Sequence, residues 1–188
     1  MERLLQAAVL DTLQDHMQLT LYYAAKPCLT MNRELITQLI ESPTEDAIEA
    51  LFDDEDTVFW VDWREEDDAI VEYCESIIQT GSLSADVVDA DNDAGFEMYI
   101  NYKDKRMKVP IVFGTEDRHI TIVSLNEILV PDFEVRFCID SNGADTLAFL
   151  PLAFDVWREL ETQHGEAVAK RFCKMQMKPN VFTDSLPF

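Results

Sequence analysis

Carboxylates are the most numerous side chains in this sequence that could do chemistry, and they are concentrated in one segment. Residues 41–97 include 20 acids and a single base, Arg64, a net charge of -19. The whole chain carries -22, so the other 131 residues contribute only -3. Clustered carboxylates can coordinate a cation, supply an acid and a base for catalysis, or attract a basic partner. Each possibility makes a different demand on the neighbouring residues.

The attraction of a basic partner is favoured by the stretch DDEDTVFWVDWREEDDAIVEY, residues 53–73, which sets two tryptophans between acidic blocks. Carboxylates in the first turn of a helix gain about 0.3–1 kcal/mol each from the helix dipole, which explains one or two of the four acids at 65–68. The alternative is a merely solvated face. If the segment is functional, these residues contact the partner: Asp53, Asp54, Glu55, Asp56, Asp62, Trp63, Glu65, Glu66, Asp67, Asp68, Glu72, Asp89, Asp91 and Asp93.

A cation site has its best match in DADNDAGFE, residues 89–97. Asp89, Asp91 and Asp93 occupy positions 1, 3 and 5 of an EF-hand loop. The glycine falls at position 7 instead of 6, and Ile100 stands at position 12, where a bidentate Glu is required. The EF-hand pattern therefore fails, and we expect an acidic loop without metal or cofactor. A calcium site of another kind is the remaining alternative.

Catalysis has no recognisable motif here, since the sequence lacks G-x-S-x-G, P-loop, G-x-G-x-x-G and H-E-x-x-H patterns. His16, His119 and His164 are isolated from one another. In PDFEVR, Asp132 and Glu134 are alternate residues of one strand, unlike the separated carboxylates of metal-dependent nucleases. Four widely spaced cysteines without C-x-x-C disfavour a zinc site or redox dithiol and suit a reducing compartment. We expect no catalytic residues, so the protein is predicted not to be an enzyme.

Helices are expected before the acidic segment. Apolar periodicity predicts one over residues 4–24 and a second over 32–41. A third, ending at Phe52, would start at a Ser42 capping box with Pro43 as its first residue. The first 52 residues are therefore predicted to be helical.

A strand and a helix are expected to display the acids. VFWV, residues 58–61, favours β-structure and is too short for a helix, which predicts a strand buried on both faces. Trp60 is expected in the core, and Trp63 at the end of the strand as an interface anchor. Asp62 is expected to cap the following helix, and Gly81 to end it. Residues 82–94 are predicted to form a polar loop.

Alternating apolar residues then predict strands over 96–102, 107–113 and 133–139, with another around Ile120 and Ile122. Ser124 would open a short helix that ends at Pro131. Helical spacing predicts a closing helix over 150–175 with a break at Gly165, and residues 178–188 show no periodicity.

These elements predict a single α+β domain over residues 1–188. It combines a helical part (1–52), strands with one acidic helix (56–140), a closing helix packed on the sheet (150–175) and a tail (178–188). The central sheet is expected to be mainly antiparallel, with about four to five strands. Glu2, Asp11 and Asp15 interrupt any signal peptide, and no apolar run approaches 18 residues. We therefore expect a cytoplasmic protein that does not enter a membrane.

The acid-dense segment with Trp60 and Trp63, in an α+β frame without catalytic motifs, resembles the small acidic immunity proteins encoded beside bacterial toxins. This resemblance implies an inhibitor that neutralises a basic partner, such as a cytosol-acting nuclease toxin, by covering its active site or substrate groove. One alternative is a nucleic-acid mimic that blocks a DNA- or RNA-binding protein. A second is a divalent-cation binder or an enzyme of unknown class. Direct binding to nucleic acid is not expected, because the negative net charge repels phosphates.

Overall fold

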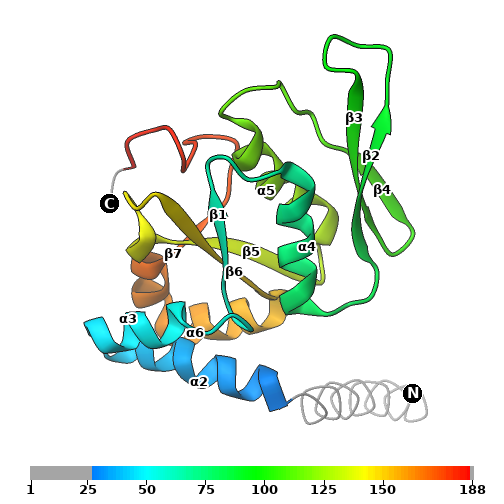
Figure 1. Ribbon diagram of the computed structural model, residues 1–188. Helices are drawn as coiled ribbons and strands as arrows, with labels where there is room; N and C mark the ends of the chain where they lie inside the picture. The colour runs from blue at the N-terminus through cyan, green and yellow to red at the C-terminus, as the bar shows by residue number, and fades with distance from the viewer. Residues whose placement is uncertain (1–26, 187–188) are drawn as a thin grey trace, which may run out of the picture.

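The computed structural model describes residues 27–186, with side chains from Arg33 onward. The helix predicted over residues 4–24 lies outside this range. The α+β class is confirmed, but the strands form two antiparallel sheets of four and three strands instead of one (Figure 1). The helices and strands occur in this order: α2 (Pro27–Glu41), α3 (Glu45–Phe52), β1 (Phe59–Asp62), α4 (Asp67–Ile78), β2 (Leu83–Asp89), β3 (Phe96–Tyr102), β4 (Lys105–Lys108), α5 (Asp117–Leu129), β5 (Phe133–Cys138), a 3-10 turn (Ile139–Ser141), β6 (Thr146–Ala153), α6 (Phe154–Arg171) and β7 (Phe172–Lys174).

The four-stranded sheet has the order β1-β6-β5-β7, so β6 lies between β1 and β5. Residues 147–152 of β6 are all buried. Leu147 and Phe149 pack into one half of the core, whereas Ala148 and Leu150 pack into the other half. A strand covered on both faces consists of a continuous apolar run, and β6 has this pattern.

Helices cover both faces of this sheet (Figure 1). Helices α2, α3 and α6 cover one face, where Leu51 and Trp157 join the core. Helices α4 and α5 cover the other face, where Ile70 and Leu125 pack with Phe149. No helix within residues 27–186 is long and apolar enough to cross a membrane.

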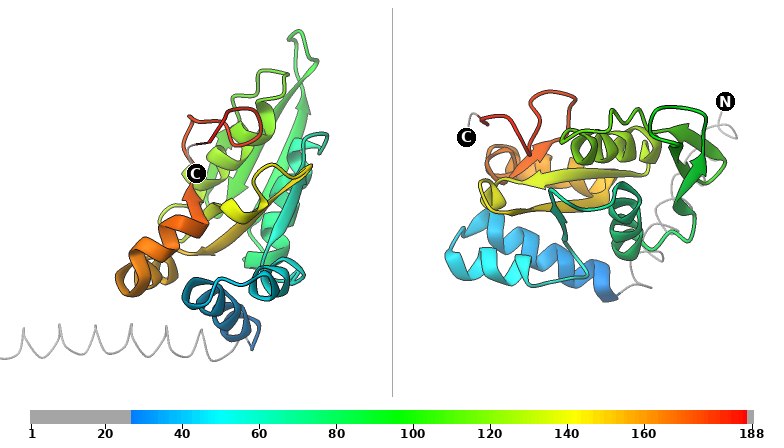
Figure 2. Two further views of the ribbon diagram at one scale, coloured as in Figure 1. Left: turned by 90° about the vertical axis from the view of Figure 1, so that its left-hand side faces the viewer. Right: turned by 45° about the horizontal axis from the view of Figure 1, so that its top comes forward.

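The three-stranded sheet, with the order β2-β3-β4, packs against the α4 and α5 side of the molecule. Met98 and Ile100 of β3 face inward and are buried. The end of this sheet that carries the β2–β3 turn projects beyond the helices (Figure 2, left).

The loop predicted over residues 82–94 is wrong in its first half, because residues 83–89 form β2. Leu83 and Ala85 face the core, which supplies the alternation of a strand. Asp86 faces outward, where it accepts hydrogen bonds from Asn101 (3.0 Å) and Arg106. The acidic character that indicated a loop is therefore accommodated by cross-strand pairing, and the connection shrinks to residues 90–95.

The strand predicted around Ile120 and Ile122 is also wrong, because both residues lie in α5. This helix is buried almost all round, and even His119 and Ser124 are inaccessible. A helix without a solvated face lacks the amphipathic spacing by which helices are predicted. The capping box predicted at Ser124 falls inside α5, which ends shortly before Pro131 as expected.

The closing helix starts at Phe154, later than the predicted residue 150, because residues 146–153 form β6. The predicted break at Gly165 is a kink at His164 (φ -136°, ψ 28°), after which the helix continues to Arg171. The chain then adds β7 at the edge of the sheet, pairing with β5.

Three further helix starts differ from the prediction by a few residues. Helix α2 begins at Pro27 instead of residue 32. Thr44 caps α3 in place of Ser42, because its hydroxyl accepts the N–H of Ala47 (3.2 Å). Asp62 accepts the N–H of Arg64 (2.7 Å), so it stabilises the turn before α4 and does not cap the helix.

Two predicted ends shift as well. Helix α4 ends at Ile78 and is capped by Gln79, which adopts a left-handed conformation (φ 50°) two residues before Gly81. The return strand predicted over 107–113 is the shorter β4, and only Val109 beyond it bonds back to Met98 (2.9 Å). Pro110, which has no N–H to donate, follows directly.

We expect Trp157→Phe to lower the free energy of unfolding by about 2 kcal/mol. The indole N–H of Trp157 donates to the carbonyl of Glu134 (2.8 Å), and the ring lies under the Arg136 guanidinium (4.0 Å). The matched control Trp63→Phe alters an exposed ring and should change stability by less than about 0.5 kcal/mol. Urea denaturation of both variants measures the difference, and equal losses would contradict this account.

Candidate functional site

Strand β1 separates the predicted acidic residues into two groups (Figure 1). Asp53, Asp54, Glu55 and Asp56 lie in the connection from α3 to β1, at one end of the strand. The acids at 62–66 lie at its other end, in the connection to α4. The two groups are close in the sequence, but the extended strand β1 places them at opposite ends of the strand.

Two exposed aromatic residues lie among the acids after β1. Trp63 is 58% exposed and Tyr73 is 36% exposed. The Tyr73 hydroxyl donates to the carboxylate of Glu65 (3.1 Å), which ties helix α4 to the preceding turn. The Arg64 guanidinium lies 4.5 Å from the centre of the Trp63 ring. We call this surface the β1–α4 patch; it comprises Asp62, Trp63, Glu65, Glu66, Glu72 and Tyr73.

A rigid support lies beneath the β1–α4 patch. Strand β1 pairs with β6 through Asp62, and α4 buries Ile70 and Cys74. The expected burial of Trp60 is met only in part, because its ring packs edge-on against Phe52 (5.1 Å) but stays partly exposed on the edge strand β1. Trp63 is exposed, as expected. Tyr73, in contrast, has the spacing of a core residue in the sequence and contributes to the surface.

Asp67 differs from the other predicted contact residues because it is engaged inside the protein. Its carboxylate accepts a hydrogen bond from Thr121 (3.2 Å) and lies 3.4 Å from Arg118, which joins α4 to α5. Burial raises the pKa of Asp67 to about 6 and outweighs the Arg118 guanidinium, which lowers it. Asp67 therefore serves packing between the two helices.

The third group of acids, Asp89, Asp91 and Asp93, lies at the β2–β3 turn. Asn92 organises this turn by accepting the N–H of Gly95 (2.8 Å) and donating to the carbonyl of Phe96 (2.9 Å). Within residues 27–186 no three His, Cys, Asp or Glu side chains gather as a metal site.

Folding neutralises some of the acids of the 41–97 segment and leaves others uncompensated. Asp67, Asp86 and Glu97 form ion pairs with Arg118, Arg106 and Lys108, and Glu41 lies 3.7 Å from His164. Most of the predicted contact residues form no ion pair with a base of the described chain: Asp53, Asp54, Glu55, Asp62, Glu65, Glu66, Asp68, Glu72, Asp89, Asp91 and Asp93. The negative potential therefore stays high at these positions.

The connection between β4 and α5 exposes another aromatic residue that the sequence pattern assigned to a strand. The buried Asp117 accepts the backbone N–H groups of Val112 (2.7 Å) and Gly114 (2.8 Å). Between them Phe113 adopts a left-handed φ of 62°, which costs a residue with a Cβ about 1–2 kcal/mol. Its ring packs edge-on against Phe96 (5.5 Å) and is still 52% exposed.

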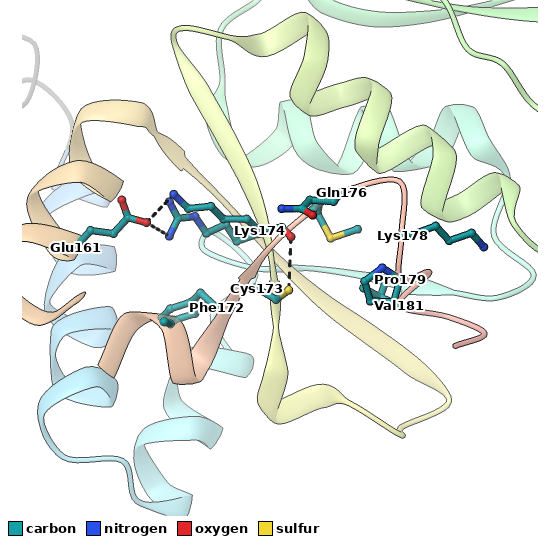
Figure 3. Close-up of a pocket in the computed structure, with 11 residues that line it drawn as sticks. Glu161, Phe172, Cys173, Lys174, Gln176, Lys178, Pro179 and Val181 are labelled. Atoms are coloured by element: carbon teal, nitrogen blue, oxygen red, sulfur yellow. Dashed lines mark hydrogen bonds and ion pairs between the residues drawn. The ribbon is translucent and has the colours of Figure 1, made fainter. Parts of the chain in front are cut away.

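A cavity of about 320 Å³ lies between α6, β7 and the C-terminal segment (Figure 3). The buried Arg136 at its wall binds Glu134 (2.8 Å) and Glu161 (2.9 Å). Lys174 also binds Glu161 (2.8 Å), and Figure 3 shows both contacts converging on that carboxylate. These ion pairs connect α6 to β5 and β7, so the charged residues at the wall of the cavity hold the helix against the sheet.

The two carboxylates of PDFEVR also have structural partners. Asp132 accepts hydrogen bonds from Tyr102 (3.1 Å) and Lys103 (2.7 Å), which lowers the pKa of Asp132 despite its partial burial. Glu134 binds the guanidinium of Arg136. These contacts link β5 to the β3–β4 turn and to the core.

The buried histidine and thiols contribute to packing. His119 Nε2 lies 2.8 Å from the carbonyl of Gln176, and the N–H of Val181 donates to His119 Nδ1 (3.4 Å). This pair of contacts fits a neutral imidazole, in agreement with burial, which lowers the pKa of His119. Burial raises the pKa of Cys74 and Cys138, which keeps these thiols protonated.

We expect the free energy of unfolding to rise as pH falls from about 7 to about 5. In this range the folded protein binds a proton at Asp67, whose pKa is about 6, whereas an unfolded Asp has a pKa of about 3.9. Stability is therefore gained below the folded pKa and lost as pH rises through it. Asp67→Asn should flatten this dependence in urea denaturation at the two pH values.

The matched control is Asp68→Asn, which removes the same charge one residue away and should retain the gain at low pH. If the two variants show the same pH dependence, the gain arises from general charge repulsion and the role assigned to Asp67 is wrong.

The chain was compared with protein-family models, with curated proteins and with solved structures. None of the three comparisons gave a match.

Proposed function

We propose that this protein binds a basic protein partner through the β1–α4 patch and thereby inhibits it. The observation that carries the proposal is the exposure of Trp63 and Tyr73 beside carboxylates that form no ion pair within the described chain. Tryptophan, tyrosine and arginine supply most of the residues that dominate binding energy at protein interfaces. Uncompensated acids around them would speed association with a cationic surface.

The support beneath the β1–α4 patch favours a binding role over a flexible solvated face. The Tyr73–Glu65 hydrogen bond and the pairing of Asp62 with Thr146 restrict the patch before a partner arrives. A restricted surface loses less conformational entropy on binding than a mobile one. Four acids in the patch also repel one another, and a cationic partner would relieve this repulsion.

The inhibited partner in this proposal is a toxin that acts in the cytosol, and a nuclease is the best example. A nuclease must present a basic groove to nucleic acid, and an acidic surface with two aromatic anchors is complementary to such a groove. A nucleic-acid mimic would need carboxylates in regular rows. The acids lie instead at the two ends of β1 and at the β2–β3 turn, so a mimic has less support.

The test is affinity capture from lysate of the source cell and with the product of the adjacent gene, at about 0.15 M and about 0.5 M salt. One basic protein retained at high salt is the expected result. With that protein purified, Trp63→Ala should raise the dissociation constant about thirtyfold, which corresponds to a loss of about 2 kcal/mol of binding free energy. Glu65→Lys with Glu66→Lys should slow association about tenfold at low salt.

The charge-matched control reverses Asp104 in the β3–β4 turn and Glu127 in α5, two exposed acids away from the β1–α4 patch, to lysine. It should alter association much less than the patch variant. If every captured protein is released by salt, or if the two double variants behave alike, the acids act as a nonspecific polyanion and the proposal is wrong.

A further inference from the structure

The inner face of the three-stranded sheet is covered along only part of its length. The register and the alternation put Val87 and Phe96 on the same face as Met98 and Ile100. Met98 and Ile100 are buried, whereas Val87 is 52% exposed. The uncovered end is the end that projects beyond the helices (Figure 2, left). Apolar side chains there have no covering element in the described chain.

The connection before α5 enlarges this apolar surface. Phe113 contacts Phe96 through its ring, and Val112 beside it is exposed. The two hydrogen bonds to Asp117 hold the backbone on both sides of Phe113, so the exposed ring has a fixed direction. A strained, exposed aromatic residue is unusual unless its display is useful, because glycine would adopt the same φ without strain.

Carboxylates border this apolar surface. Asp89 pairs with Phe96 in the register, and Asp91 and Asp93 lie in the adjoining turn. Asn92 makes the side-chain hydrogen bonds that shape the turn, so the conformation of the turn does not depend on the three aspartates. We call this surface the distal patch; it comprises Val87, Phe96, Val112 and Phe113 with Asp89, Asp91 and Asp93.

The charge of the distal patch determines which occupant fits. A second copy of this chain would bring three more aspartates into the contact and a net charge of -22 with it. An anionic membrane surface would be repelled for the same reason. A cationic polypeptide with apolar side chains would gain from both components of the surface.

We infer that the distal patch is a second docking surface, which receives apolar side chains of a basic polypeptide between Val87 and Phe113 while its cations approach the three aspartates. The inference rests on the proposed function in one respect, that the natural partner is basic. It does not require the β1–α4 patch, which lies on a different connection of the chain.

The decisive variant is Phe113→Gly, because glycine accepts the left-handed φ and removes only the aromatic ring. The probe is a short amidated peptide that alternates Lys with Leu and Phe, labelled for fluorescence anisotropy; a peptide of Lys and Ser is its control. We expect Phe113→Gly to keep a melting temperature within a few degrees of the original protein and to bind the apolar cationic peptide at least tenfold more weakly.

The matched pair Val87→Ser and Val88→Ser tests the face, since these neighbours in β2 point to opposite sides of the sheet. Val87→Ser should lower the affinity for the apolar cationic peptide several-fold, and Val88→Ser should leave that affinity nearly unchanged. Equal effects of the pair, unchanged binding by Phe113→Gly, or a large loss of stability in that variant would overturn the inference.

Further measurements separate this inference from the proposed function. Trp63→Ala should not affect peptide binding at the distal patch; if it abolishes binding while Phe113→Gly does not, the β1–α4 patch is the docking surface and the inference fails alone. If only Phe113→Gly has an effect, both on the peptide and on the captured partner, the proposed role of the β1–α4 patch fails alone. Sedimentation that shows a dimer dissociated by Phe113→Gly would identify a second copy as the occupant and overturn the cationic one.

Discussion

Strand β6 bonds to β1 on one side and to β5 on the other, and helices cover both of its faces. Six consecutive residues, 147–152, are thereby removed from solvent. Burying an aliphatic or aromatic side chain of this kind contributes about 1.5–3 kcal/mol. The burial joins a layer formed by α2, α3 and α6 to a layer formed by α4 and α5. It also fixes β1, and the two ends of β1 then determine where two groups of acids are displayed.

Elements with one clear periodicity could be predicted from the sequence. Strands β3 and β5 and helix α6 belong to this group, because their apolar residues recur at one spacing. Helix α3 is predicted from its capping box, and strand β1 from a short continuous run of β-favouring residues. Helix α5 is buried over most of its surface and strand β6 on both faces, so no clear alternation of polar and apolar residues marks them. Strand β2 was hidden by Asp86, whose charge is paired only when Arg106 of a later strand lies beside it.

The candidate site was predictable only in part, for a similar reason. The acids and the exposure of Trp63 follow from local sequence, whereas the internal role of Asp67 depends on Thr121 and Arg118, more than 50 residues away. The position of Tyr73 at the surface depends on how α4 rotates against the sheet. No local signal predicts that Asp117 would hold Phe113 in a left-handed conformation.

Folding redistributes charge as well as apolar surface. The bases that pair with the acidic segment come mostly from one later stretch, in Arg106, Lys108 and Arg118. They neutralise the outer face of the three-stranded sheet and the α4–α5 contact, and none of them reaches the turn after β1. The excess of acid in residues 41–97 is therefore concentrated at the two ends of β1 and the β2–β3 turn, where salt screens repulsion between close neighbours least.

The edges of the two sheets differ in length, and this difference bears on aggregation. Strands β1, β4 and β7 are edge strands of four, four and three residues, too short to template much pairing with another chain. Strand β2 is an edge of seven residues with two exposed valines. Asp89, with Asp91 and Asp93 in the adjoining turn, places like charges at one end of that edge, so two copies that approached it in antiparallel pairing would repel each other there. The same acidity that strains the folded chain thus discourages the growth of fibrils from its longest open edge.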